Sequence, residues 1–338
     1  MHFDYNYYLK FTLCWLTSFF FHNQKNCNIE HTKKPDISTF KVLISSSKYG
    51  IKYWNPDNGS IVNELKYVNY GLCISELLKN GNLVNIVNEN ILVLNNTLGV
   101  VIKNISLSKF GLSSVQELSD STLAISDFNA NIHILSPTSG KLIRSFSLNS
   151  SSSSSTNMKL LNNGNLAVSF ANEVRILNTA DGRLERVLVG QKEWVSCMEL
   201  LKNGLLAVGS DDRRVKIWNT TTGGLIRVLF GFTSSIINFL KVLDDGSLAI
   251  SSGNVEISIW NPNTGELLAK LTETDYVYSM ESLNNGRLAV GSIRKIKIWN
   301  IRNGKLVSVF NAYQSNKEDD AYAVMKYAEI KYIKPKPK

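Results

Sequence analysis

Several chemical signatures are missing from this 338-residue chain, and each absence removes a class of function. The four cysteines show no CxxC pair and the four histidines are scattered, so the ligand spacing of a zinc site is missing. There is also no glycine-rich phosphate loop, no GxSxG nucleophile elbow and no HExxH pair. Paired acids such as Asp211 and Asp212 occupy turn positions rather than those of a catalytic pair. We therefore expect no metal, no cofactor and no catalytic residue.

Helical periodicity and strong charge clustering are also scarce. No window of the internal repeat sustains an apolar period of about 3.6 residues, which argues against helical arrays. The net charge is +9, and part of it is local, because residues 325–338 hold five lysines against Glu329 and end in KPKPK. A terminal Lys/Pro run is typical of a solvated tail, and no interleaved arginines and aromatics support base stacking. We expect neither nucleic acid nor a membrane as partner, apart from the N-terminal apolar segment.

The N-terminal residues 1–38 have no clear role in the sequence. Residues 9–21 are apolar and aromatic, but they fall short of the about 18 to 20 residues that span a bilayer. Asp4 lies in the leader, Lys10 is its one basic side chain, and no small-residue cleavage site follows Phe21. A signal or anchor is the alternative to an added strand or an appended piece. We expect a cytoplasmic protein, or a secreted one if residues 9–21 are a signal segment.

What the chain does contain is an internal repeat. The string LAVGSDDRRVKIWNTTTG at residues 206–223 returns as LAVGSIRKIKIWNIRNG at residues 288–304. Seven copies follow one another at intervals of 39 to 42 residues, each ending in a glycine: Gly59, Gly99, Gly140, Gly182, Gly223, Gly265 and Gly304. Four residues separate each glycine from a slot filled by tryptophan or leucine: Trp54, Leu94, Leu135, Leu177, Trp218, Trp260 and Trp299.

Turn signals divide each copy into strands. Five copies carry a further Asn-Gly or Asp-Gly dipeptide, at residues 80–81, 163–164, 203–204, 245–246 and 285–286. Such dipeptides between alternating apolar residues predict hairpins, because both turn positions tolerate a positive φ. Each copy therefore predicts four strands. A sheet of this size has two apolar faces, with Val215 and Ile217 expected on one face and Trp218 on the other.

A period of about 40 to 45 residues with four strands is typical of a radial propeller. We therefore predict an all-β fold, a seven-bladed β-propeller. Blade one lacks an evident first strand before Trp54, and residues 321–333 at the C-terminal end offer one. We expect this segment to complete blade one and close the ring, since closure removes exposed sheet edges. The chain then divides into the N-terminal segment 1–38, the propeller 39–333 and the basic tail 334–338.

The copies resemble WD repeats, the β-propeller family of interaction scaffolds. The best match is GSDDRRVKIWNTTTG at residues 209–223, and the resemblance spans about residues 40–333. Each Trp-Asp of the family is Trp-Asn here, at Asn55, Asn219, Asn261 and Asn300, and three copies have leucine in place of tryptophan.

The family's Gly-His pair is also replaced, by Gly190-Gln191 and Gly231-Phe232. The family's buried network of His, Ser, Asp and Trp is therefore fragmentary. The residues of this chain that come nearest to that network are Asp211 or Asp212, Ser196 and Trp218.

The resemblance implies a non-catalytic scaffold or adaptor, a monomeric propeller that binds a peptide or protein partner on one face. The alternative is a lectin-like or quinoprotein-like propeller, or the propeller part of a larger multidomain protein. Quinoproteins would place a tryptophan after each Thr-Gly motif, which GGLIRVL and GELLAKL lack. Lectins would repeat the same pocket residues in every blade, whereas the loops here differ from copy to copy.

The candidate partner-binding residues come from these divergent loops. They are Lys192, Trp194, Asp211, Arg213, Ser235, Tyr276, Arg294, Lys295 and Asp127. Aromatic residues and arginine most often anchor interfaces, so Trp194 and Tyr276 are the predicted anchors, and Arg213 with Arg294 is predicted to select an acidic segment. The alternative is that the two aromatics merely cover the tops of their blades.

Overall fold

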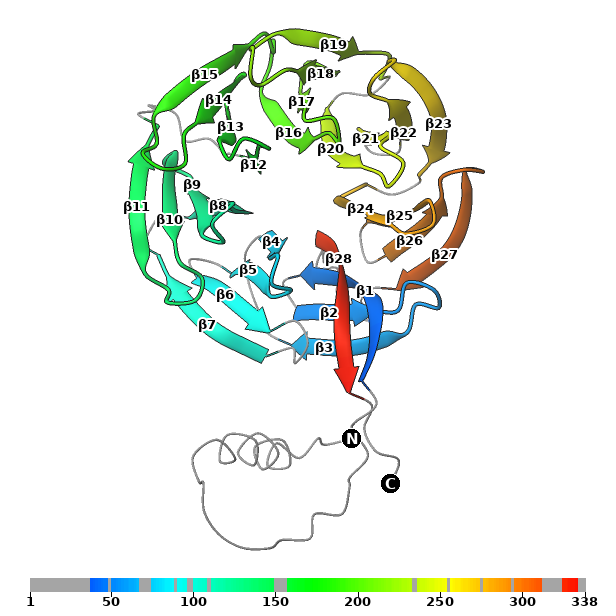
Figure 1. Cartoon of the computed structure of the whole chain (residues 1–338). Coiled ribbons are helices and arrows are strands. Elements are labelled where there is room, and N and C mark those ends of the chain that lie inside the picture. Colours follow the sequence, from blue (N-terminus) through cyan, green and yellow to red (C-terminus); the bar gives the residue numbers. More distant parts are fainter. Residues whose placement is uncertain are drawn as a thin grey trace, which may run out of the picture. The chain divides into compact units, whose positions relative to one another are not determined.

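Each copy of the repeat folds as strands of a four-stranded antiparallel sheet, and seven such sheets form the blades of a ring (Figure 1). The computed structural model describes residues 37–47, 50–66, 74–87, 90–95, 100–107, 111–148, 157–232, 236–253, 256–273, 276–292, 295–311 and 324–333. Contacts group Ser38–Tyr332 into one unit. No helix in the described ranges is long and apolar enough to cross a membrane. The N-terminal segment 1–36 and the tail 334–338 lie outside these ranges.

The strands of each blade follow one another from the inside of the ring to its outside. Blade one contains β28 (Val324–Ile333), β1 (Ile37–Ser47), β2 (Gly50–Trp54) and β3 (Ile61–Lys66). Blade two contains β4 (Ile74–Leu77), β5 (Leu83–Val87), β6 (Asn90–Asn95) and β7 (Val100–Ser106). Blade three contains β8 (Leu112–Glu117), β9 (Leu123–Asp127), β10 (Asn131–Leu135) and β11 (Leu142–Ser147). Blade four contains β12 (Met158–Leu160), β13 (Leu166–Phe170), β14 (Glu173–Leu177) and β15 (Leu184–Val189).

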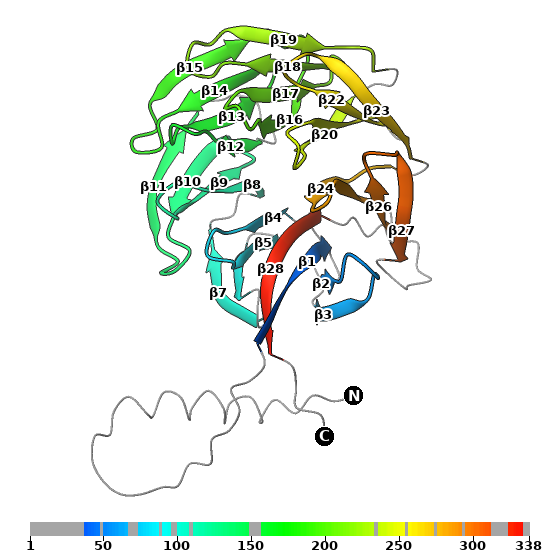
Figure 2. The same cartoon turned by 45° about the vertical axis from the view of Figure 1, so that its right-hand side comes forward.

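The remaining three blades have the same order. Blade five contains β16 (Val195–Leu200), β17 (Leu206–Ser210), β18 (Arg214–Trp218) and β19 (Leu225–Leu229). Blade six contains β20 (Ile237–Val242), β21 (Leu248–Ser252), β22 (Glu256–Asn261) and β23 (Glu266–Thr272). Blade seven contains β24 (Ser279–Leu283), β25 (Arg287–Gly291), β26 (Lys295–Asn300) and β27 (Lys305–Asn311). Figure 2 shows the outer strands β11, β15, β19, β23 and β27 along the circumference.

The two ends of the propeller meet in blade one. The strand order of that sheet is β28-β1-β2-β3, so a C-terminal strand pairs with the first strand of the described chain (Figure 1). This confirms the predicted closure, with the strand itself starting at Val324; residues 321–323 lie outside the described residues. Closure of this kind covers an edge of β1 that would otherwise be free to pair with other chains.

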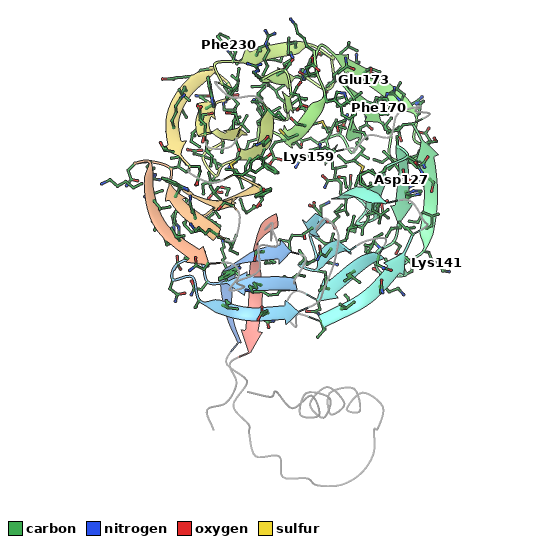
Figure 3. The ribbon with its side chains drawn as sticks, turned by 180° about the vertical axis from the view of Figure 1, so that it is seen from behind. Asp127, Lys141, Lys159, Phe170, Glu173 and Phe230 are labelled. Carbon is green, nitrogen blue, oxygen red and sulfur yellow. The ribbon has the colours of Figure 1, made fainter. Side chains whose placement is uncertain are left out.

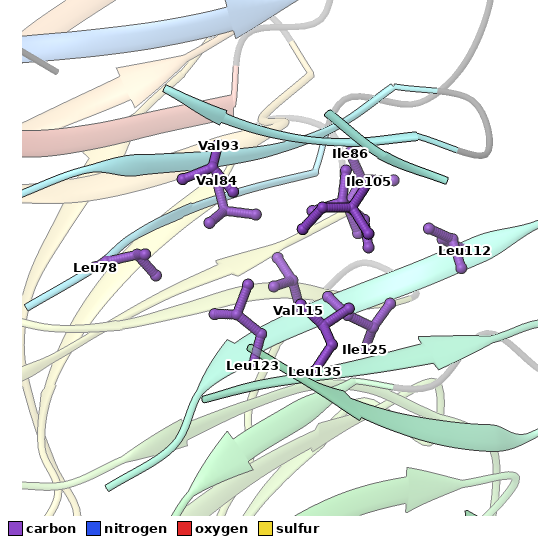
Figure 4. Packing of buried hydrophobic residues seen from close by; sticks show 11 residues of the cluster. Leu78, Val84, Ile86, Val93, Ile105, Leu112, Val115, Leu123, Ile125 and Leu135 are labelled. Atoms are coloured by element: carbon purple, nitrogen blue, oxygen red, sulfur yellow. The ribbon is translucent and has the colours of Figure 1, made fainter. Parts of the chain in front are cut away.

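The core is divided among the junctions between blades. Within the described residues there are seven clusters of buried apolar side chains, and each joins two adjacent blades. Figure 4 shows the cluster between blades two and three, where Val84, Ile86 and Val93 face Val115 and Ile125. A single blade therefore has no core of its own, since both of its apolar faces are buried by neighbours.

The tryptophan slot lies at these junctions. Val215 and Ile217 pack against blade six, and Trp218 packs against blade four, which confirms the predicted alternation. All seven slots face the preceding blade: Trp54, Leu94, Leu135, Leu177, Trp218, Trp260 and Trp299. At each of them the register of the third and fourth strands shifts, as in a β-bulge.

The asparagine after the slot and the glycine that ends the copy build the turn between the third and fourth strands. Asn219 Oδ1 accepts hydrogen bonds from the backbone nitrogens of Thr221 and Thr222, both at 3.0 Å. An aspartate would accept the same bonds, which explains how Trp-Asn can replace Trp-Asp. The glycine has a second role: Gly59 has a φ of +71°, and a Cβ there would lie 2.3 Å from the ring of Phe310 in blade seven.

Polar contacts join the inner strands of neighbouring blades. The Nζ atom of Lys159 in blade four lies 2.6 Å from a carboxylate oxygen of Glu199 in blade five. In the same way, Nζ of Lys241 in blade six lies 2.9 Å from a carboxylate oxygen of Glu281 in blade seven. Figure 3 places Lys159 on the inner side of the ring. These half-buried pairs add polar links between inner strands whose blades already share apolar clusters.

Closure predicts the effect of truncation. Deleting residues 324–338 removes β28 and leaves β1 as an unpaired edge, so we expect aggregation or the loss of cooperative unfolding, measured by size-exclusion chromatography and thermal melting. Deleting residues 334–338 alone keeps β28 and serves as the control, with an unchanged melting temperature. A longer deletion that stays monomeric at the same melting temperature would contradict the closure.

The junctions predict unequal effects for two adjacent substitutions. Trp218→Ala removes a buried side chain from the junction of blades four and five and should cost about 3 to 5 kcal/mol in the free energy of unfolding. Asn219→Asp keeps the hydrogen bonds of the turn and should stay within about 0.5 kcal/mol. Denaturant unfolding of both variants measures the difference; equal losses would mean that Trp218 does not hold the junction.

Candidate functional site

Two kinds of loop gather at one end of the ring, which we call the rim: those that precede the inner strands and those that join the second and third strands. In blade five these are residues 190–194 and 211–213, and the backbone nitrogen of Asp211 donates to the carbonyl of Trp194 at 2.9 Å. In blade seven the nitrogen of Tyr278 donates to the carbonyl of Gly291 at 2.8 Å. The rim therefore carries the segments in which the copies differ most.

Hydrogen bonds hold the rim backbone of blade five in one conformation. Ser210 Oγ donates to the carbonyl of Glu193 and accepts from the nitrogen of Asp212, both at 3.1 Å. Arg213 has a φ of +63°, and its nitrogen donates to the carbonyl of Ser210 at 3.2 Å. A non-glycine residue in this left-handed conformation needs support from its surroundings. Trp194 and Arg213 are thus held by rigid backbone.

A buried ion pair supports these loops from below. Lys216 Nζ lies 2.7 Å from Asp212 Oδ2 and donates to Gln191 Oε1 at 2.6 Å, and both charged side chains are about 5% exposed or less. Asp212 Oδ2 also accepts from the backbone nitrogen of Lys192 at 3.1 Å. Burial alone would raise the pKa of Asp212, but the hydrogen bonds from Lys216 and Lys192 and the nearby charges outweigh it and hold that pKa below its usual value.

This pair replaces the network that the sequence suggested. Asp212, and not Asp211, is the buried acid, and its partner is Lys216. Ser196 does not take part, because its Oγ donates to the carbonyl of Ile237 in blade six. Trp218 Nε1 is buried with no hydrogen-bond partner among the described residues. The partners of Asp212 are therefore Lys216 and the backbone of Lys192, and neither Ser196 nor Trp218 contributes a hydrogen bond to it.

Above this pair the rim of blade five is hollowed. An open depression of about 660 Å³ is lined by Lys192, Glu193, Asp211, Asp212, Arg213 and Ile236. Beside it Trp194 is 51% exposed, although it is a large apolar side chain. Burial raises the pKa of Asp211, and the negative charges of Glu193 and Asp212 add to the effect. The structure thus brings Lys192, Trp194, Asp211 and Arg213 together.

Blade seven contributes separately to the same end of the ring. Tyr276 is 36% exposed, and its ring centroid lies 4.7 Å from that of Tyr278. Lys295 is exposed at the start of β26. Blade six lies between these residues and blade five. Ser235 and Arg294 fall outside the described residues.

Asp127, which is labelled in Figure 3, differs from the other candidates because it is fully buried. Its Oδ1 accepts from the nitrogens of Asn129 and Asn131, and its Oδ2 lies 3.2 Å from His133 Nε2. It holds its own turn and presents no surface to a partner. The next residue, Phe128, is 39% exposed on that turn.

Sequence reasoning named Trp194 and Tyr276 but missed Ile236, which stands at the same register in the blade between them. Trp194, Ile236 and Tyr276 each stand directly before the buried residue that begins the inner-strand segment, namely Val195, Ile237 and Val277. All three side chains are at least 36% exposed. We call Trp194, Ile236 and Tyr276 the rim stripe. The alignment of the copies could have revealed it, because the three positions coincide when the inner strands are superposed in sequence.

The described residues offer little for metal or thiol chemistry. No group of three or more His, Cys, Asp or Glu side chains in the described part of the chain could hold a metal ion. Cys197 is a buried free cysteine, and burial raises its pKa to about 12, so it stays a protonated core side chain near neutral pH. Cys197 is therefore a core residue, and Cys73 lies outside the described residues.

Comparison with known families supports the same architecture. A family model for the WD domain, G-beta repeat, matches residues 182–219, which include β15 to β18 and the rim loops of blade five. The match covers the outer strand of blade four and the first three strands of blade five, in a ring of seven four-stranded blades. This match and the seven-bladed ring together support a WD-repeat β-propeller. No curated protein matches the chain. Propellers of this family are generally scaffolds for protein interactions and are typically not enzymes.

The buried pair of Lys216 and Asp212 predicts that substitutions of the two residues have non-additive effects on the free energy of unfolding. Lys216→Met should cost about 3 to 5 kcal/mol, because Asp212 is then left buried without its cation, and adding Asp212→Asn should recover much of the loss. Since the folded pKa of Asp212 is lowered, the stabilisation is present above the unfolded pKa of about 3.9 and is lost as the pH falls through the folded pKa. Urea unfolding at several pH values measures both effects.

The exposed pair of Arg183 and Glu185, 2.7 Å apart, is the control for this prediction. Arg183→Met should leave the free energy of unfolding almost unchanged, because solvent screens an exposed pair. If Lys216→Met is equally mild and Asp212→Asn does not compensate it, the buried pair does not support the rim.

Proposed function

We propose that this propeller is a non-catalytic scaffold that binds a protein or peptide segment on its rim, across blades five, six and seven. The observation that carries the proposal is the rim stripe. Exposed apolar side chains also occur along the outer strands, but Trp194, Ile236 and Tyr276 are exposed beside the inner strands, at one register of three consecutive blades. Aromatic side chains held on rigid backbone are favoured anchors, since little conformational entropy is lost on binding.

The charges beside the stripe indicate what the bound segment contains. Lys192, Glu193 and Arg213 are exposed, and none of them makes an ion pair with another described residue. A carboxylate of the partner fits opposite Arg213 and Lys192. A cation of the partner fits opposite Asp211, whose raised pKa follows from burial and from the neighbouring negative charges. The proposed ligand is an extended segment with an apolar side chain between an acidic and a basic residue.

The fold suits this role because it separates the binding residues from the core. The rim stripe, Lys192 and Arg213 lie outside the junction clusters, so their side chains are free for recognition while the strands keep the ring closed. The bound segment would lie on a preformed surface, since hydrogen bonds already fix the backbone of residues 210–213. Such a surface loses little entropy on binding.

The test is affinity capture of the tagged chain followed by mass spectrometry, with a rim variant. Trp194→Ala combined with Arg213→Gln should abolish capture of the main partner, because both the apolar anchor and the cation are lost. The melting temperature and circular dichroism should change little, since Trp194 is half exposed and Arg213 makes no side-chain hydrogen bond or ion pair with a described residue.

A matched control lies at the opposite end of the ring. There an open depression of about 310 Å³ between blades five and six includes Lys202, Asn203 and Asn263 in its lining. Lys202→Ala with Asn263→Ala should leave capture intact. If capture survives the rim variant and is lost with this control, the rim assignment is wrong.

A further inference from the structure

Six Asn-Gly pairs occur in the chain, and this dipeptide is the one most prone to spontaneous deamidation. They are residues 58–59, 80–81, 163–164, 203–204, 285–286 and 303–304. In the reaction the backbone nitrogen of the glycine attacks the side-chain carbonyl carbon of the asparagine. Glycine permits this approach because it has no Cβ to obstruct the ring that forms. Attack requires a nitrogen whose N–H is not donated elsewhere and an asparagine side chain that is free to turn.

Hydrogen bonds hold most of these pairs in an unreactive state. In blade five the nitrogen of Gly204 donates to the carbonyl of Leu201 at 2.9 Å, and Asn203 Oδ1 accepts from the nitrogen of Leu205 at 3.0 Å. The pairs at 58–59, 80–81 and 163–164 are held at both groups in the same way. At 303–304 the asparagine is held, because Asn303 Oδ1 accepts from the nitrogen of Lys305 at 3.0 Å.

The pair in blade seven is different, although its turn has the same length. Asn285 itself has a φ of +65°, whereas the other four Asn-Gly and Asp-Gly turns between first and second strands have a positive φ at glycine alone. With this backbone, the nitrogen of Gly286 donates to no acceptor among the described residues, and the exposed side chain of Asn285 makes no hydrogen bond to them. Both reacting groups are therefore free.

A cation also lies against Gly286, the residue whose nitrogen reacts. A Cβ placed on Gly286 would be 3.6 Å from Nε of Arg302, so the guanidinium stem of this exposed residue lies against the glycine. A positive charge at that position favours the loss of the amide proton and stabilises the negative charge that develops during attack.

We propose that Asn285 is a site of spontaneous modification, where the folded protein itself selects one asparagine out of six for deamidation. The amide nitrogen of Gly286 loses its proton and forms a bond to Cγ of Asn285, and ammonia leaves, which gives a five-membered cyclic imide. Water then opens this ring to aspartate or isoaspartate. The net change is the gain of one water molecule and the loss of one ammonia molecule, with no oxidant or reductant.

The modified turn lies next to the seam where the ring closes. Arg287, two residues further on, pairs with Asp57 of blade one, with Nη1 and Oδ1 2.9 Å apart. A new carboxylate at position 285 competes with Asp57 for Arg287, and isoaspartate adds a backbone atom to the turn. Modification is therefore expected to weaken this contact between blades seven and one.

The experiment is a time course of the folded full-length chain in mildly alkaline buffer, with peptide mapping by mass spectrometry and chromatographic separation of aspartate from isoaspartate. Asn203 is the internal control, because it lies in the same dipeptide at the same turn of another blade. We expect Asn285 to react about tenfold faster than Asn203, since reaction at Asn203 first requires its hydrogen bonds to open. In denaturant the two rates should become similar.

The result that would overturn the proposal is a folded chain in which Asn203 or Asn163 reacts as fast as Asn285, or in which Asn285 does not react. A difference that persists unchanged in denaturant would also overturn it, because the selection would then come from local sequence and not from the fold. The proposal is independent of the rim, so capture of a partner does not bear on it.

Discussion

The burial of both faces of every blade is the constraint on which the rest of this structure depends. A four-stranded sheet of this size is apolar on two sides, and the clusters that bury it are shared, so each blade is completed by its neighbours. Two consecutive residues of one strand illustrate this: Ile217 packs toward blade six and Trp218 toward blade four. An open row of such blades would expose an apolar face at each end. The packing of blade seven against blade one buries both of these faces, and the pairing of β28 with β1 completes the first blade with a strand from the C-terminal end.

The polar interior obeys the same geometry. In several blades the third residue of the third strand is a cation paired with an acid that precedes it in the chain: Arg175 with Glu173, Lys216 with Asp212, and Lys297 with Glu273. In blade seven the acid also accepts from Trp299 Nε1 at 2.6 Å, and in blade one Trp54 Nε1 donates to Ser45 Oγ at 2.9 Å. A buried pair is weak evidence for net stability but is costly to break, so these pairs fix which conformation the loops above them adopt.

The sequence predicted the repeating features well and the singular ones poorly, and packing explains the difference. The number of blades, the closing strand and the alternation around Trp218 follow from residues that every copy shares, because every junction needs the same shape. The pairing of Lys216 with Asp212 and Gln191 depends on three segments that differ between copies, so no repeat pattern signals it. The burial of Asp127 was missed for a similar reason, since a turn acid looks exposed until its hydrogen bonds to Asn129 and Asn131 are known. Ser235 and Arg294 stay predictions.

The loops at the two ends of the ring therefore tolerate amino-acid substitution to different degrees. At the end opposite the rim, five turns carry Asn-Gly or Asp-Gly because their backbone requires positive φ, and all of them except the Asn285 turn have a positive φ at glycine alone. At the rim, the conformation of residues 210–213 is set by Ser210, Asp212 and backbone bonds, which leaves the outward side chains of Trp194 and Arg213 unconstrained by packing. Substitution there changes the chemistry of the surface without opening a junction. A scaffold built in this way can acquire a new partner through a few rim residues, and that is the physical reason to look for recognition at the rim rather than at the turns of the other end.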